Sequence, residues 1–153
     1  MTPEKILLEE KSIVGLVTRT NNHTEMQTNE GKIGPLWHQF LSSQLQEKLS
    51  TLQKPVLTYG VYNNFDSDIH GDYDITLGHA VLKDGINSDF HEVKIFAGSY
   101  LHFKKQGEMP QAVIEAWQEV WSYFKSNPIP RAYKSDFECY STPDTIDIYI
   151  SLK

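Results

Sequence analysis

The sequence has a single cysteine, no long apolar run and no cluster of basic residues. Because Cys139 has no second cysteine with which to form an internal disulfide, we expect a reducing compartment and predict a cytoplasmic protein. A membrane-spanning helix needs about 18 or more consecutive apolar residues, and no such run occurs, so we expect no membrane association. The first ten residues also lack the basic-then-apolar pattern of a signal peptide.

Basic residues are few and scattered along the chain. There are 14 Lys and Arg residues against 20 Asp and Glu residues, which gives a net charge of −6, and Lys104 and Lys105 are the only adjacent basic pair. Proteins that bind phosphate backbones concentrate Lys and Arg on one surface. We therefore expect no direct binding to nucleic acid, whereas an acidic surface attracts cations weakly.

Motifs for metal, cofactor or catalytic chemistry are also missing. The six histidines have no zinc-ligand spacing, and there is no glycine-rich phosphate loop or nucleophile elbow. The stretch from Asp66 to Asp74 resembles a calcium loop, but its twelfth position, which requires an acidic residue, is Leu77. We therefore predict no metal site, no cofactor and no catalytic residues.

The same order of secondary-structure elements is expected twice along the chain: a strand, a helix with an apolar stripe, and two further strands. In the first half the elements are expected at 12–20, 33–52, 56–63 and 72–82, with Pro55 ending the helix. In the second half they are expected at 91–103, 110–124, 135–140 and 145–152, with Asn127 and Pro128 ending the helix.

The two halves also align residue by residue. Trp37 matches Trp117 in the helical stripes, and Tyr62 and Tyr140 follow these tryptophans at nearly the same distance. We predict one α+β domain over 1–153, made of pseudo-repeats 11–83 and 90–153. Each repeat is a β-α-β-β unit, and together they form a curved, mainly antiparallel sheet with two main helices. A shared amphipathic period is the alternative explanation for the likeness. The junction between two such halves is a common place for a ligand.

Alternation along the strands sorts the side chains by face. Phe137 and Cys139 point to one side of the expected strand, and we expect them to pack against the helices. Glu138 and Tyr140 then point to the opposite side. By the same rule the last strand places Tyr149 on one face and Ile146, Ile148 and Ile150 on the other.

The repeat gives Glu138 an unequal counterpart. Gly60 occupies the place of Glu138, and Tyr62 occupies the place of Tyr140. One half therefore carries a carboxylate where the other leaves room, as an unsymmetrical ligand site requires. The alternative is an exposed carboxylate on a solvated face of the sheet.

Three stretches carry a resemblance to a known family: Phe96-Ala97-Gly98-Ser99-Tyr100-Leu101 with Phe103 and Gly107, then Ala116-Trp117 with Val120-Trp121, then Asp136-Phe137-Glu138 with Tyr140. With Gly60, Tyr62 and Tyr73-Asp74-Ile75 they cover nearly the whole chain. The sequence resembles the GyrI-like small-molecule-binding domain, which is found in AraC-type and MerR-type multidrug-responsive transcription activators. It is most similar to small stand-alone members, including drug-binding proteins carried on integron cassettes.

The resemblance implies a role for Glu138 as the partner of a cationic, lipophilic or aromatic small molecule. The resemblance and the strand faces together give these ligand-binding candidates: Glu138, Tyr140, Tyr62, Trp37, Trp117, Trp121 and Tyr149. Only about ten residues precede the first expected strand, too few for a helix-turn-helix DNA reader. We therefore expect a stand-alone sensor or sequestering module, with a separate regulatory protein as a candidate partner.

Two other functions stay open. Some relatives hydrolyse reactive electrophiles, and there Glu138 would activate water in an aromatic channel, although no second titratable group is evident beside it. Other relatives inhibit gyrase by binding it, but this sequence has no long acidic run that would mimic nucleic acid. Each tryptophan also has a purely structural alternative, because a tryptophan on an amphipathic helix often packs in the core.

Overall fold

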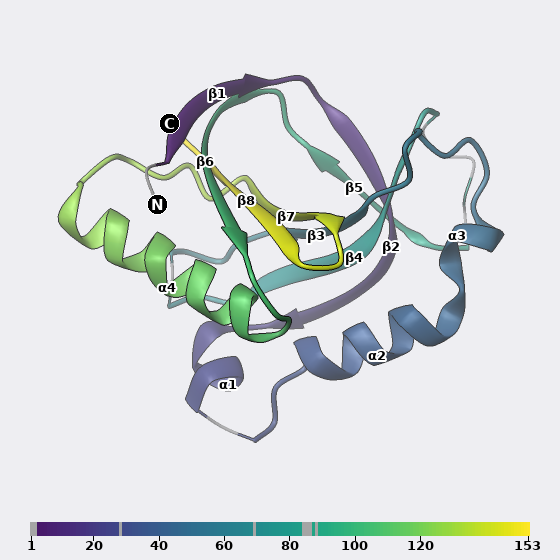
Figure 1. The fold of residues 1–153 in the computed structure, drawn as a ribbon, viewed down its shortest axis with the longest axis horizontal. Helices are drawn as coiled ribbons and strands as arrows, with labels where there is room; N and C mark the ends of the chain where they lie inside the picture. The colour runs from purple at the N-terminus through teal and green to yellow at the C-terminus, as the bar shows by residue number, and fades with distance from the viewer. Residues whose placement is uncertain (1–2, 28, 69, 84–86, 88) are drawn as a thin grey trace.

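The computed structural model of the chain describes residues 3–27, 29–68, 70–83, 87 and 89–153. The described residues form one antiparallel eight-stranded sheet with four helices, which confirms the predicted α+β class and curved sheet (Figure 1). The strands are β1 (Glu4–Leu8), β2 (Lys11–Thr20), β3 (Thr58–Asn63), β4 (Tyr73–Val81), β5 (His91–Ile95), β6 (Gly98–Gln106), β7 (Ser135–Thr142) and β8 (Thr145–Ser151). The helices are α1 (Asn22–Gln27), α2 (Ile33–Ser43), α3 (Leu45–Lys48) and α4 (Gln111–Ser126).

The strand order is symmetric about the centre of the sheet. It runs β1-β6-β8-β7-β3-β4-β2-β5, so that β6-β8-β7 of the second half mirrors β2-β4-β3 of the first. The central pair, β3 and β7, runs antiparallel with Gly60 directly opposite Glu138. Since these are the two residues that the repeat alignment equates, this register supports the proposal that the chain is duplicated.

The edge strands are exchanged between the halves. β1 pairs with β6, and β5 pairs with β2, so each half gives its first strand to the other. β1 was not predicted, although the short apolar run Ile6-Leu7-Leu8 is its sequence trace. The edges curl over the face of the sheet opposite α2 and α4 (Figure 1). Both faces of the central strands are consequently covered.

Two predicted elements are interrupted in the structure. The strand expected at 91–103 is two strands, because the chain passes from pairing with Lys11 at Ile95 to pairing with Leu8 at Gly98. Gly98 has a φ of +151°, a conformation that a side chain rarely permits. The helix expected at 33–52 ends at Ser43, and Gln44 adopts a left-handed conformation before the short α3.

The break after α2 has a local cause. The hydroxyls of Ser42 and Ser43 donate to the carbonyl oxygens of His38 (2.9 Å) and Phe40 (2.6 Å), in competition with the next helical turn. At the other end, the Glu25 carboxylate accepts hydrogen bonds from the amides of Lys32 (2.7 Å) and Ile33 (3.1 Å). A carboxylate at a helix N-terminus is favourable, so these contacts fix where α2 begins.

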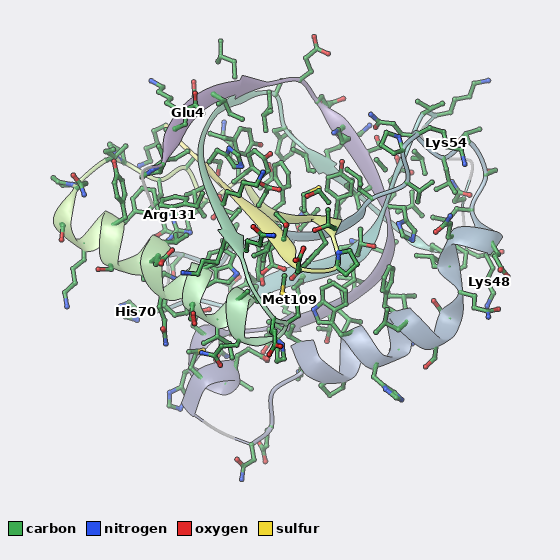
Figure 2. All side chains as sticks on the ribbon, viewed as in Figure 1. Glu4, Lys48, Lys54, His70, Met109 and Arg131 are labelled. Carbon is green, nitrogen blue, oxygen red and sulfur yellow. The ribbon has the colours of Figure 1, made fainter. Side chains whose placement is uncertain are left out.

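The core is divided by the sheet. α4 packs over Leu101, Phe103 and the isoleucines of β8, and α2 packs over Ile75 and Leu77, all on the helix side. A separate cluster around Tyr59, Tyr100 and Phe137 lies on the inner side of the curl. Side chains fill the molecule around the sheet and the helices, and Arg131 lies beyond the end of α4 (Figure 2). Among the described residues, no helix combines the length and the apolar character that crossing a membrane requires.

Candidate functional site

Glu138 lies at the centre of the sheet on the helix side and is almost fully buried, with 2% of its surface exposed. Its Oε2 accepts hydrogen bonds from the indole Nε1–H of Trp117 (2.6 Å) and from the hydroxyl of Tyr62 (2.9 Å). Its Oε1 accepts one from the hydroxyl of Tyr140 (2.9 Å). The carboxylate therefore has three donors but no cation beside it among the described residues.

Burial dominates the ionisation of this group. Removal of water raises the pKa of Glu138 above its ordinary value, and the bonds from Trp117, Tyr140 and Tyr62 only partly offset that effect. Burial, together with the nearby Glu138, also raises the pKa values of Tyr62 and Tyr140, so both hydroxyls stay protonated. A buried anion held by neutral donors is incompletely compensated, and a positive charge would restore part of the lost solvation.

Gly60 gives the carboxylate its space. A Cβ built on Gly60 would lie 2.9 Å from Oε1 of Glu138 and 3.3 Å from Cδ2 of Leu77. Any other residue would push the carboxylate or the leucine aside, so the glycine and the glutamate fit each other across β3 and β7.

The rings around Glu138 come from both halves in a reciprocal arrangement. Trp37 of α2 contacts Tyr140 of β7 edge-on, with 5.1 Å between ring centroids. Trp117 of α4 contacts Tyr62 of β3 in the same manner, at 5.2 Å. Each helix thus places its tryptophan on the tyrosine of the other half, and both tyrosines donate hydrogen bonds to Glu138.

Six of the seven predicted site residues lie on this side of the sheet. Glu138, Tyr62, Tyr140 and Trp117 form the hydrogen-bonded group, and Trp37 packs on Tyr140. Trp121 packs on Trp117 at 6.1 Å and extends the aromatic surface along α4.

Tyr149 lies elsewhere. It occupies the inner face, with its ring stacked between those of His102 (4.5 Å) and Phe137 (4.5 Å). The prediction that Tyr149 lines the same site as Glu138 is therefore wrong. The alternation along β8 already separated it from Ile146, Ile148 and Ile150, which pack under α4.

The direction of the two faces also differs from the prediction. We expected Phe137 and Cys139 to pack against the helices, but they lie in the inner cluster, and Glu138 and Tyr140 face the helices. Alternation shows which residues share a face, and that grouping is confirmed. It cannot show which face the helices cover when the curled edges bury the other one.

Sequence reasoning missed a cavity of about 750 Å³ on the inner face, where Lys11 and Tyr59 meet. Its signal in the sequence is the second set of alternating residues, Tyr59, Phe137, Cys139 and Tyr149.

Among the described residues there is no cluster of three or more potential metal-binding side chains. Asp66 and Asp74 of the calcium-like stretch instead form ion pairs with Arg19.

The chain combines a symmetric curled sheet, two covering helices and a buried carboxylate lined by aromatic rings between the two halves of the sheet. Residues 6–152 match the sequence profile of the family described as integron-associated effector binding protein. The chain belongs to this family.

Known proteins are similar to this chain in sequence, in fold or in both. The integron cassette protein VCH_CASS2 of Vibrio cholerae is 34% identical, with a TM-score of 0.88 over 100% of this chain and 97% of that one. YobU of Bacillus subtilis (strain 168), provisionally named a transcriptional regulator, is 29% identical over 95% of this chain and 94% of its own length. The structure of SAV2435 bound to tetraphenylphosphonium has the same fold, with 17% identity and a TM-score of 0.80 over 100% of this chain and 94% of that one.

Proposed function

We propose that this protein binds lipophilic or aromatic cations on the helix side of its sheet, with Glu138 as the counter-charge. The observation that carries the proposal is a fully buried carboxylate that accepts only neutral hydrogen bonds and is enclosed by aromatic rings. A cation that reaches it gains an ion pair in a poorly solvated site and cation–π attraction of about 0.5–2 kcal/mol for each ring.

The ligand reaches Glu138 by moving the rings that cover it. Trp37 and Trp117 are only partly buried, and each belongs to a helix that packs on a different half of the sheet. Swinging either indole away uncovers the carboxylate without disturbing the strands. Because flat rings accept many shapes while the carboxylate requires charge, the site combines broad shape tolerance with a preference for cations.

The fold neighbour SAV2435 supports the choice of probe. It was solved with tetraphenylphosphonium, a cation that carries four phenyl groups. Family membership supports effector binding in general. A stand-alone sensor or sequestering role, with a separate regulatory protein as a partner, is the biological form we propose for this binding.

The test is a titration with tetraphenylphosphonium monitored by tryptophan fluorescence, because Trp37, Trp117 and Trp121 surround the site. Glu138→Gln keeps the shape of the side chain and removes its charge, so we expect affinity to fall at least about tenfold. Neutral triphenylphosphine oxide should bind more weakly than the cation to the wild type, and about equally well to both proteins. Glu47→Gln, which removes an exposed charge on α3, is the matched control and should bind as the wild type does.

Equal affinity of the wild type and Glu138→Gln for the cation would contradict the proposal. A loss of affinity in Glu47→Gln of the same size would show that only the net charge matters.

One observation favours the hydrolase alternative. The hydroxyls of Tyr62 and Tyr140 lie 2.9 Å from the carboxylate and stay protonated, so they can donate hydrogen bonds to the oxygen of a reactive electrophile beside Glu138. Incubation with an aromatic epoxide separates the two functions. Turnover that disappears in Glu138→Gln would favour hydrolysis, and binding without turnover would exclude it for that substrate.

A further inference from the structure

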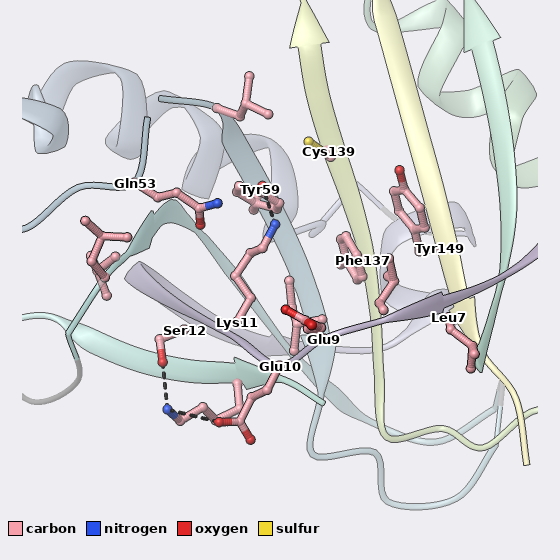
Figure 3. A pocket seen from close by; sticks show the side chains of 16 residues that line it. Leu7, Glu9, Glu10, Lys11, Ser12, Gln53, Tyr59, Phe137, Cys139 and Tyr149 are labelled. Carbon is pink, nitrogen blue, oxygen red and sulfur yellow. Dashed lines mark hydrogen bonds and ion pairs between the residues drawn. The ribbon is translucent and has the colours of Figure 1, made fainter. Parts of the chain in front are cut away.

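The inner face of the sheet holds a cavity of about 750 Å³, whose lining side chains are drawn in Figure 3. It lies on the side of β7 that carries Phe137 and Cys139, opposite to the side on which Glu138 bonds to Trp117. Its volume is that of a pocket for a drug-sized molecule. The floor is made by the central strands, and the wall is made by the corner where β1 passes into β2 and by the end of β5. The lining includes Leu57, Tyr59, Phe137, Cys139, Tyr149 and Lys11.

Lys11 brings a positive charge into this cavity. Its Nζ donates a hydrogen bond to the hydroxyl of Tyr59 (3.2 Å) and lies 5.3 Å from the centroid of the same ring (Figure 3). In the part of the chain that the structure describes, no carboxylate lies within ion-pair distance of this ammonium group. Lys94, the other lysine of the cavity, is different, because it binds Ser12 Oγ (2.7 Å) and Glu10 (3.8 Å).

The acidic residues of the cavity lie at its rim. Glu9 and Glu10 are exposed at the corner between β1 and β2, where water solvates them, and Glu10 pairs with Lys94. The half-buried ammonium of Lys11 has less water around it, and its partner is a neutral phenol. An anion that pairs with Lys11 therefore restores more lost solvation than a cation that pairs with the exposed rim carboxylates. The carboxylates of Glu9 and Glu10 repel the anionic group of a ligand. That group is therefore directed to Lys11, and the apolar body of the ligand lies along the floor.

The floor suits an aromatic or aliphatic body. Phe137 and Tyr149 both line the cavity and stack on each other, with 4.5 Å between centroids and 14° between planes, so they form one apolar block in its floor. Leu8 and Leu57 are packed against the same cluster. Lys11 and this surface together present one positive charge beside an extended apolar area.

We propose that the inner cavity is a second binding site, for an amphipathic anion with one carboxylate or sulfonate group on an aromatic or aliphatic body, and that Lys11 is its counter-charge. The two faces of the central strands then select opposite charges: Glu138 binds cations on the helix side, and Lys11 binds anions on the inner side. The second site stands on its own residues and does not depend on cation binding at Glu138.

The probe is 8-anilinonaphthalene-1-sulfonate, whose fluorescence rises when it leaves water. Saturable binding at one site is expected for the wild type, and Lys11→Met should weaken it at least about tenfold, since the methionine keeps the apolar stem and removes the charge. Lys125→Met removes an exposed charge on α4 and is the matched control, with unchanged binding expected. Glu138→Gln should also leave it unchanged, which separates this site from the cation site.

A second measurement keeps the test decisive if Lys11→Met does not fold. Cys139, the only cysteine in the sequence, lines the cavity, so its modification by neutral methyl methanethiosulfonate can be followed by intact mass in the wild type. Bound 8-anilinonaphthalene-1-sulfonate should slow the modification of Cys139, and tetraphenylphosphonium should not. The proposal is overturned if the wild type shows no saturable sulfonate binding, if Lys11→Met binds as the wild type does, or if bound sulfonate leaves Cys139 equally reactive.

Discussion

At the scale of single residues, the site depends on the match between Gly60 and Glu138. The two residues face each other across the centre of the sheet, and the carboxylate fills the space that a side chain on Gly60 would take. Oε1, the oxygen nearest to Gly60, also accepts the bond from Tyr140. A change at residue 60 therefore reaches the carboxylate, its hydrogen bonds and the adjacent ring at once.

Gly60→Ala is expected to destabilise the protein and to weaken cation binding. The added methyl group meets Oε1 at 2.9 Å and a side-chain atom of Leu77 at 3.3 Å, so the core must shift, at a cost of about 1–3 kcal/mol in the free energy of unfolding. Urea unfolding and a tetraphenylphosphonium titration measure the two effects.

Gly34→Ala is the control for this substitution. No heavy atom lies within 4 Å of a Cβ built on Gly34, and alanine favours helix, so stability should hold or rise by up to about 1 kcal/mol. If Gly60→Ala changed the free energy of unfolding no more than Gly34→Ala does, the close fit between Gly60 and Glu138 would not contribute to stability.

At the scale of elements, α4 supplies the shortest hydrogen bond to the carboxylate, 2.6 Å from Trp117 Nε1. Its position is fixed by Ala116 and Val120, which are buried against the sheet, and this places Trp117 with its indole N–H on Glu138. The other end of the helix leads to Arg131, which forms a buried ion pair with Asp136 on β7 (2.8 Å). The helix is therefore linked to the strand that carries Glu138 directly through Trp117, and indirectly through Arg131, whose guanidinium lies over the ring of Phe124 in the last turns of α4.

Trp117→Phe tests the indole donor. The phenyl ring keeps most of the packing but cannot donate, so the charged form of Glu138 loses a bond and its pKa should rise further. We expect unfolding at neutral pH to become easier by about 1–3 kcal/mol, as for loss of a bond to a charged group. The pH midpoint of tetraphenylphosphonium binding should move to higher pH.

Trp121→Phe removes an indole that packs on Trp117 but is not one of the three donors to Glu138, and it should leave the midpoint where it is in the wild type. A midpoint that moved equally in both variants would point to the loss of aromatic packing rather than to the hydrogen bond.

The elements were largely predictable from periodicity, and their interruptions were not. The stripes that contain Trp37 and Trp117 predicted both long helices, and α4 ends before the predicted stop at Asn127. The end of α2 depends on serine hydroxyls that bind the preceding carbonyl oxygens, and the break at Gly98 depends on a change of pairing partner. Such events are set by tertiary contacts and leave little trace in hydrophobic spacing.

At the scale of the whole molecule, the exchange of edge strands decides what each face of the sheet does. β1 and β5 cross to the opposite halves and curl over the inner face, so that residues of both alternating sets are buried. Glu138, Tyr62 and Tyr140 share one face, as strand alternation predicted. The helices lie on the side opposite to the predicted one, and Tyr149 lies apart from Glu138, because alternation does not reveal β1 or the curl of the sheet.

A duplicated chain, which we propose, would account for a site that is aromatic on both sides and charged on one. Trp37 on Tyr140 and Trp117 on Tyr62 are equivalent contacts under the repeat, whereas Glu138 and Gly60 are not. The symmetric rings enclose a ligand, and the single carboxylate gives it a charge requirement. We propose that this combination, rather than any one residue, defines the cation site.

The ionisation of Glu138 makes the affinity for a cation depend on pH. In the free protein burial raises that pKa, so at a pH below it the carboxyl group is protonated and must lose a proton before a cation can pair with it. Bound cation favours the charged form and lowers the pKa. Affinity for tetraphenylphosphonium should accordingly be constant above the pKa of the free protein and fall as the pH drops through it.

The most direct measurement is a pH titration of the Glu138 side-chain carboxyl carbon by NMR, with and without tetraphenylphosphonium, its signal assigned by its absence in Glu138→Gln. We predict a pKa above the ordinary glutamate value in the free protein and a clear decrease when the cation is bound. A pKa that does not change on saturation with the cation would contradict the claim that Glu138 is the counter-charge of the ligand.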